Sequence, residues 1–182
     1  LSNVLFKKNN QKKKILKIFK KLLISHNQIL YSLGNKYKDS YEKKLILSLK
    51  KINHVSLVGM GGSILGAKAI YSFLKPKKKK FKFIDNLSNV LFKKNNQKSI
   101  NLIISKSGNT LETISNSNIL IDKKNHNIFL TENKKNYIKS LAEKLKARVV
   151  HHNNFIGGRY SVLSEVGMLP AQLMGFKPEK LR

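Results

Sequence analysis

Three short loops of this 182-residue chain carry the donors that an anion needs. They are residues 59–63 (GMGGS), 105–110 (SKSGNT) and 157–161 (GGRYS). Each follows a strand-like run and opens a predicted helix, so backbone N–H groups and the positive end of a helix dipole face one point. The loops therefore predict a site for phosphate or a similar anion.

The second loop is the richest in donors. Ser105, Ser107 and Thr110 supply three hydroxyl groups, and Asn109 adds an amide within the same turn. A phosphate monoester dianion is bound by such a nest of hydroxyl and backbone N–H groups. The alternative is an ordinary helix N-cap with incidental hydroxyl groups, and we favour phosphate binding.

The first loop combines glycines with one serine. Glycine allows a ligand to approach the backbone closely, and Ser63 can donate its hydroxyl group and its N–H group. A tight strand-to-helix turn explains Gly62 and Ser63 equally well, so this loop alone leaves both interpretations open. A dinucleotide site is disfavoured, because the G-x-G-x-x-G pattern requires a glycine where the chain has Ile64.

Charged side chains near the loops offer few catalytic candidates. Arg159 is the one arginine in the three loops, and a fixed cation can stabilise negative charge that develops during a reaction. An arginine that only pins its loop fits the sequence equally well. His151 and His152 are interpreted as part of a surface loop. Glu112 and Glu165 fall inside predicted helices, and neither is favoured as a general base.

The order of the three loops resembles the first sugar-isomerase (SIS) domain of the phosphoglucose isomerase family. The resemblance covers about residues 54–181, and its most specific parts are 157–164 (GGRYSVLS) and 166–171 (VGMLPA). It implies an aldose–ketose isomerase that interconverts glucose 6-phosphate and fructose 6-phosphate without a metal or a cofactor. The implied catalytic residue is Arg159, which would stabilise an enediolate. The implied substrate-binding residues are Gly62, Ser63, Ser105, Ser107 and Thr110.

The same resemblance implies that the chain is incomplete. In that family a glutamate, a histidine and a lysine that transfer protons follow this region, so we expect a missing second SIS domain and an inactive fragment. We also expect a homodimer at full length. The Ser-Gly-Asn-Thr form of the turn leaves the substrate range open, including mannose 6-phosphate. Two alternatives remain: a single-SIS-domain sugar-phosphate isomerase of another specificity, and a regulatory module that senses a phosphosugar.

An alternation of short apolar runs and helical segments must position the loops. The five runs predict a parallel sheet that is doubly wound, in a flavodoxin-like α/β fold with N-terminal helices. Ligands bind outside the carboxyl ends of such strands, where all three loops fall. The predicted strands are 55–58, 81–84, 100–104, 127–130 and 147–150. The predicted helices are 63–74, 87–94, 110–121, 134–146 and 161–174.

The chain divides into three predicted parts. Residues 1–12 recur unchanged at 87–98, and we interpret the first copy as a duplication artefact. Residues 13–50 form a helical segment, with one helix over 13–33 and another over about 39–49. The first helix has lysines on one face, and we favour packing against the domain over a membrane surface. Residues 51–182 form the first SIS domain.

Composition limits the remaining classes. The net charge of +28 suggests a polyanion partner, but only three of the 37 basic residues are arginines, which are preferred for binding phosphates and bases. A codon bias towards lysine, asparagine and isoleucine explains the charge, so we expect no specific nucleic acid partner. The chain has no cysteine and no apolar run of the roughly 18–20 residues that span a membrane. We therefore expect a cytoplasmic protein without a membrane partner.

Overall fold

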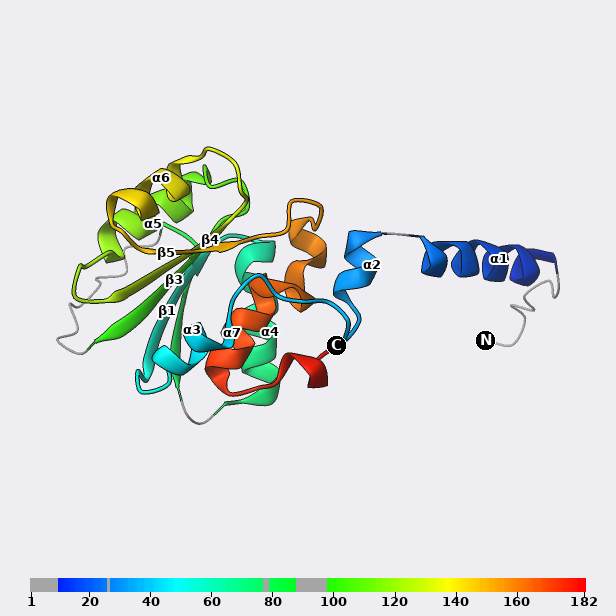
Figure 1. The fold of residues 1–182 in the computed structure, drawn as a ribbon, viewed down its shortest axis with the longest axis horizontal. Helices are drawn as coiled ribbons and strands as arrows, with labels where there is room; N and C mark the ends of the chain where they lie inside the picture. Colours follow the sequence, from blue (N-terminus) through cyan, green and yellow to red (C-terminus); the bar gives the residue numbers. More distant parts are fainter. Residues whose placement is uncertain (1–9, 26, 77–78, 88–97) are drawn as a thin grey trace, which may run out of the picture.

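A five-stranded parallel sheet forms the centre of the computed structural model, which describes residues 10–25, 27–76, 79–87 and 98–182. The strand order is β2-β1-β3-β4-β5, which confirms the predicted doubly wound, flavodoxin-like fold (Figure 1). The strands are β1 (His54–Gly59), β2 (Lys80–Ile84), β3 (Ser99–Ile104), β4 (His126–Thr131) and β5 (Arg148–His151).

Both faces of the sheet are covered by helices. Helices α3 (Lys43–Ser48), α4 (Gly62–Leu74) and α7 (Glu165–Met174) pack on one face, and α5 (Leu111–Leu120) and α6 (Tyr137–Lys144) pack on the other (Figure 1). Strand β3 lies in the middle of the sheet, and its last five residues are all buried. This burial on both faces explains why the strand is apolar at Ile100 and from Leu102 to Ile104 instead of alternating, with Asn101 as its one buried polar residue.

The last predicted helix is shorter than expected. Residues Gly158–Leu163 form a 3-10 turn, η1, and only Glu165–Met174 form an α-helix. Ser164 separates the two, because its extended backbone ends the turn and its side chain accepts a hydrogen bond from Val166 N–H. The prediction of one continuous helix over 161–174 is therefore wrong at its first turn.

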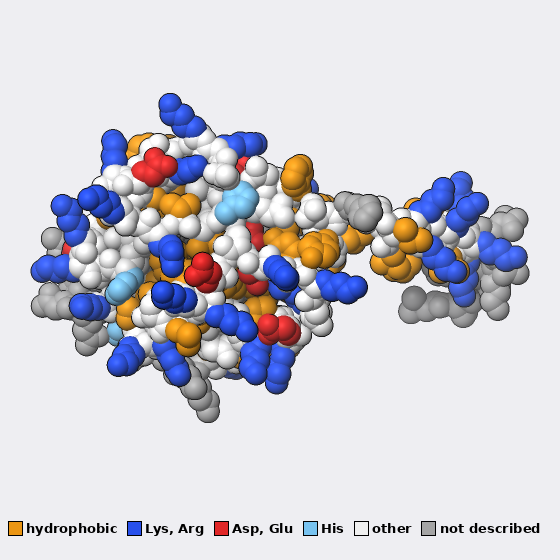
Figure 2. Space-filling model, viewed as in Figure 1, with side chains coloured by type: hydrophobic (Ala, Val, Ile, Leu, Met, Phe, Trp, Pro, Cys, Tyr) orange, Lys and Arg blue, Asp and Glu red, His pale blue; other side chains and the backbone are white. Residues whose placement is uncertain are grey.

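The N-terminal part differs most from expectation. The predicted helix 13–33 is two helices, α1 (Asn10–Ile24) and α2 (Gln28–Ser32), because the Asn27 side chain caps α2. Helix α1 extends away from the sheet (Figure 1). Its apolar side chains are exposed (Figure 2). The prediction that this helix packs against the domain is therefore wrong. The predicted second helix is the shorter α3.

Two expectations fall largely outside the described residues. They are the helix predicted over 87–94 and the two copies of the twelve-residue repeat. Among the helices that the structure describes, none has the length and apolar character needed to cross a membrane.

Candidate active site

The first and third loops meet in direct backbone contact at the carboxyl edge of the sheet. A Cβ atom added to Gly62 would lie 2.2 Å from the Gly158 carbonyl oxygen, so only glycine permits this approach. The Ser161 hydroxyl group also donates to the Gly62 carbonyl oxygen at 3.3 Å. Residues nearly 100 positions apart in the sequence are thereby brought together.

The second loop lies beside the first because β1 and β3 are neighbours. Gly59 ends β1 and pairs in register with Ile104, the last residue of β3. Ser105 follows directly, so the 59–63 and 105–110 loops leave the same edge from adjacent strands. The sequence analysis predicted that both loops fall at this edge, because the carboxyl ends of parallel strands meet there.

The 105–110 turn is organised from within. Ser105 is buried, and its hydroxyl group accepts from Gly108 N–H at 3.1 Å and bonds to the Thr110 hydroxyl group at 3.3 Å. Gly108 has φ of +68°, which places it in the left-handed region. Ser107 is exposed and Thr110 is partly exposed. Ser105 therefore shapes the turn, whereas Ser107 and Thr110 present hydroxyl groups at its surface.

The start of α6 anchors this turn from outside. Gly108 C=O accepts from Ile138 N–H at 3.1 Å, and the Asn109 side chain accepts from Tyr137 N–H at 3.1 Å. Asn136 caps α6 and donates to the Thr131 hydroxyl group at 3.1 Å. A Cβ atom on Gly108 would meet the Asn136 side chain at 2.0 Å. The sequence analysis missed Asn136 because it began the helix at residue 134, whereas α6 begins at Tyr137 and Asn136 is its N-cap.

Ser63 and Arg159 both have free polar groups. Ser63 lies in the first turn of α4, and Arg159 is an exposed residue of η1. Within the described ranges, neither the Ser63 hydroxyl group nor the Arg159 guanidinium group has a hydrogen-bond or ion-pair partner. The alternative in which Arg159 pins its own loop thus finds no support among these contacts.

A buried network lies behind the third loop. The Glu165 carboxylate, fully buried at the start of α7, accepts from Tyr37 Oη at 2.7 Å and from Asn153 N–H at 2.6 Å. It also lies 3.1 Å from His152 Nδ1. His152 is only 1% exposed, so its assignment to a surface loop is wrong. The error arose because the partner that permits its burial, Glu165, is thirteen residues away in the sequence.

Hydrogen bonds determine the charge state of this network. Burial alone would raise the pKa of Glu165, but the hydrogen bonds from His152, Asn153 N–H and Tyr37 outweigh burial and hold that pKa below its usual range. Burial and the neighbouring Glu165 carboxylate raise the pKa of Tyr37. Glu165 is therefore a fully bonded carboxylate that is poorly suited to accept a proton from a substrate.

Arg182 contacts residues next to this network. Its guanidinium group donates to Leu163 C=O at 2.8 Å, to Tyr37 C=O at 3.1 Å and to the Asp39 carboxylate at 2.5 Å. It also lies over the Tyr37 ring, 5.0 Å from the ring centre. Burial raises the pKa of Asp39, and Arg182 opposes that shift without cancelling it. Arg182 thus ties η1 to the segment that precedes α3.

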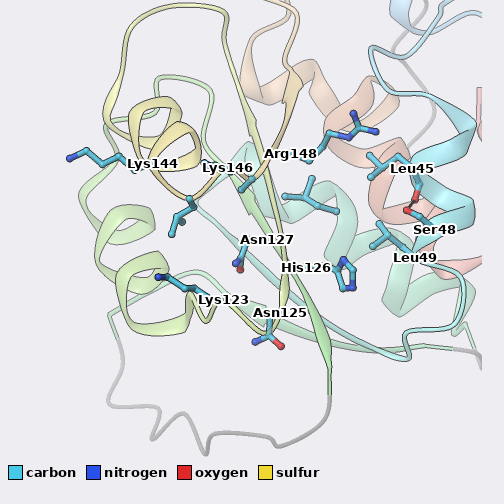
Figure 3. A pocket seen from close by; sticks show the side chains of 13 residues that line it. Leu45, Ser48, Leu49, Lys123, Asn125, His126, Asn127, Lys144, Lys146 and Arg148 are labelled. Atoms are coloured by element: carbon cyan, nitrogen blue, oxygen red, sulfur yellow. Dashed lines mark hydrogen bonds between the residues drawn. The ribbon is translucent and has the colours of Figure 1, made fainter.

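A separate cavity of about 660 Å³ lies at the opposite, amino edge of β4 and β5. Figure 3 shows His126 and Arg148 on the side of Leu45 and Leu49, whereas Lys123 and Lys144 lie towards α5 and α6. Its basic side chains have no ion-pair partner among the described residues. None of the predicted site residues lines it. No group of three histidine, aspartate or glutamate side chains in the described part of the chain is arranged to hold a metal ion.

The sheet order and the three loops at its carboxyl edge define an α/β fold of the sugar-isomerase (SIS) type. The structure is similar to that of the hypothetical protein TT0462 from Thermus thermophilus, with a TM-score of 0.67, 21% identity and coverage of 93% of this chain and 48% of that one. It is also similar to tagatose-6-phosphate ketose/aldose isomerase from Escherichia coli, with a TM-score of 0.50, 13% identity and coverage of 93% and 46%.

Sequence comparison identifies the family. The family model described as phosphoglucose isomerase matches residues 40–180, so the chain belongs to the phosphoglucose isomerase family. A curated relative, glucose-6-phosphate isomerase from Methanocaldococcus jannaschii, is 37% identical over an alignment of 146 residues that covers 74% of this chain. The match spans only 36% of that relative's length. The predicted resemblance is thus confirmed.

Proposed function

We propose that this chain binds the phosphate and the reacting carbons of a sugar phosphate for the interconversion of glucose 6-phosphate and fructose 6-phosphate. The observation that carries the proposal is the 105–110 turn, which holds open donors at the carboxyl edge of a sheet in a chain of the phosphoglucose isomerase family. The single-SIS-domain and regulatory alternatives are less well supported, because curated relatives at 32% and 37% identity are named glucose-6-phosphate isomerase.

The proposed binding step uses the donors that the fold leaves unpaired. Ser107 and Thr110 donate hydroxyl groups to the phosphate, and Ser63 adds a hydroxyl group from the first turn of α4. Backbone N–H groups at Gly62 and in the 105–110 turn add neutral donors. Ser105 contributes indirectly by holding the turn in shape.

Arg159 has the proposed chemical role. Moving a proton between C1 and C2 of the sugar creates an enediolate, and a positioned guanidinium group stabilises the charge as it forms. The free guanidinium group of Arg159 suits this role. The base is a different matter, because the Glu165 carboxylate is bonded to three partners and the Glu132 carboxylate is paired with lysines. We propose that the proton-transferring base is supplied by another part of the whole protein. We also propose that the whole protein is a homodimer.

Titration of the chain with glucose 6-phosphate tests the proposal. In ¹H–¹⁵N spectra, millimolar ligand should shift the amide signals of Ser107, Gly108 and Gly62. This concentration is sufficient because a dissociation constant of about 1 mM requires only about 4 kcal/mol of binding free energy. Ser107→Ala should weaken binding, whereas Ser72→Ala, an exposed serine on α4, should not. Shifts confined to the amino edge of the sheet would contradict the proposal.

A further inference from the structure

Lys106 is a cation inside the predicted phosphate turn, but its ammonium group is already engaged. Its Nζ donates to the Asn154 carbonyl oxygen at 2.8 Å and lies 3.1 Å from the Glu132 carboxylate. Lys134 approaches the other oxygen of the same carboxylate at 3.4 Å. A lysine at this position would ordinarily be assigned to the phosphate, and these contacts indicate a different role.

The Glu132 carboxylate is partly shielded from water and remains charged, so that it can pair with Lys106. Its side chain is 11% exposed, and that of Lys106 is 28% exposed, so the pair is shielded from water on much of its surface. Burial acts to raise the pKa of Glu132, but the hydrogen bond and charge of Lys106, followed by those of Lys134, hold it below its usual range. Glu132 therefore remains charged and retains Lys106.

The backbone of Lys106 is fixed as firmly as its side chain. Its carbonyl oxygen accepts from Glu132 N–H at 3.1 Å and from the Thr131 hydroxyl group at 3.2 Å. Thr131 C=O in turn accepts from His152 N–H at 2.8 Å. The end of β4 is thus placed between the 105–110 turn and the segment that leads to Gly157.

Asn154 is the point at which this contact reaches the third loop. It lies three residues before Gly157 and five before Arg159, and the residue directly before it, Asn153, donates its N–H group to the Glu165 carboxylate. Lys106 thereby connects the phosphate turn to the backbone that carries Arg159, across 48 positions of sequence.

We infer that Lys106 is a positioning residue that couples the 105–110 turn to the segment carrying Arg159, and that its ammonium group is not a phosphate ligand. This inference rests on the proposed function, because the coupling matters only if the turn holds the phosphate. Binding of the phosphate would then be communicated to the guanidinium group by a hydrogen bond and an ion pair instead of by the ligand alone.

The test compares Lys106→Met, Lys106→Arg and the control Lys144→Met in ¹H–¹⁵N spectra of the 182-residue chain. Lys144 is an exposed lysine of α6 without an ion pair in the described part of the chain. Without ligand, Lys106→Met should shift the amide signals of Asn154 to Gly158, whereas Lys144→Met should leave them unchanged. Lys106→Arg should restore most of the wild-type positions, because arginine can also donate to both partners.

Titration with glucose 6-phosphate supplies the measurement that a purely structural role would not affect. In the wild type, ligand should shift the signals of both Ser107 to Asn109 and Gly157 to Gly158. In Lys106→Met the second response should be lost, while the dissociation constant changes by less than about threefold. A loss of affinity of tenfold or more would indicate a direct charge-assisted contact and would overturn the inference.

Glu132→Gln provides a milder second variant, since it keeps the lysine and its bond to Asn154. It should shift the Asn154 to Gly158 signals less than Lys106→Met does. Unchanged signals in both variants would also overturn the inference. If the wild type does not respond to glucose 6-phosphate, the proposed function fails on that result, whereas the ligand-free spectra still decide whether Lys106 holds the segment.

Discussion

The two edges of the sheet are built in opposite ways. At the carboxyl edge, charged and polar side chains are paired with neighbours, as Lys106 is with Glu132 and Ser105 with Thr110, and only a few donors are left open. At the amino edge, basic side chains such as Lys144 and Arg148 surround a cavity without ion-pair partners in the described chain. Figure 2 shows lysine and arginine side chains over much of the visible surface. Positive charge is therefore spread over the surface, whereas the proposed site is distinguished by its fixed geometry.

Removing the carboxylate behind the third loop should have the largest effect. Glu165→Ala leaves the Tyr37 hydroxyl group, His152 and Asn153 N–H buried without their shared partner. We expect it to lower the free energy of unfolding by about 4 kcal/mol, as is typical when one partner of a buried pair is removed. Urea unfolding would measure this. Glu143→Ala, at an exposed position on α6, is the control and should change stability by less than about 0.5 kcal/mol.

Filling the contact between the first and third loops should rank second. Gly62→Ala would force the two backbones apart, because its Cβ would lie 2.2 Å from the Gly158 carbonyl oxygen. We expect a loss of about 2–3 kcal/mol, in the range of overpacked cores. At Gly157 the added carbon would lie 3.8 Å from Tyr160, an ordinary contact, so Gly157→Ala is the matched control. Equal unfolding curves for the two variants would contradict the described approach of the loops.

Acid should lower the free energy of unfolding through carboxylates at the carboxyl edge. The pKa of Glu165 is lowered from an ordinary 4.5, so its contribution to stability is present above pH 4.5 and is lost as the pH falls through the lower folded-state value. Glu132 acts in the same direction. The raised pKa of Asp39 acts in the opposite direction, because its contribution is lost as the pH rises. Glu165→Gln should flatten the acid limb of a stability–pH curve, and an unaltered limb would show that Glu165 does not produce it.

Changes at the amino edge should have the smallest effect. The double variant Lys144→Gln/Arg148→Gln removes two exposed charges of the cavity, so we expect a change in unfolding free energy of less than about 0.5 kcal/mol. Binding of glucose 6-phosphate should also stay within about twofold of the wild type at moderate salt, because exposed charges beyond a Debye length of about 8–10 Å are screened. Loss of binding in this variant, measured by the same titration, would remove the distinction between the two edges.

The sequence was sufficient where local patterns and the sheet determine the structure. The apolar runs gave all five strands, and adjacency of β1 and β3 followed from the doubly wound order, so the 59–63 and 105–110 loops were placed correctly. The roles of Ser63, Ser107, Thr110 and Arg159 in substrate binding and catalysis stay predictions. The run 157–164 was the most specific part of the resemblance, and the family model matches the wider range 40–180.

Contacts between distant residues account for what the sequence did not provide. His152 is buried because Glu165 and Tyr37 lie beside it, and no pattern near His152 shows either neighbour. The bond from Lys106 to the Asn154 carbonyl oxygen spans 48 positions, and nothing near Lys106 in the sequence indicates it. Helix α1 has the periodicity of a packed helix, and periodicity cannot tell whether a surface is present to receive it.

The isolation of α1 implies that this chain does not melt as one cooperative unit. Its apolar side chains such as Ile15 and Phe19, which are 65% and 52% exposed, gain little packing energy from the rest of the described residues. A free helix of 15 residues is only marginally stable in water, so α1 should lose helical content gradually on warming. The α/β unit should unfold afterwards in a single sharp transition. The far-ultraviolet ellipticity should therefore begin to decrease at temperatures below the calorimetric unfolding transition of the α/β unit.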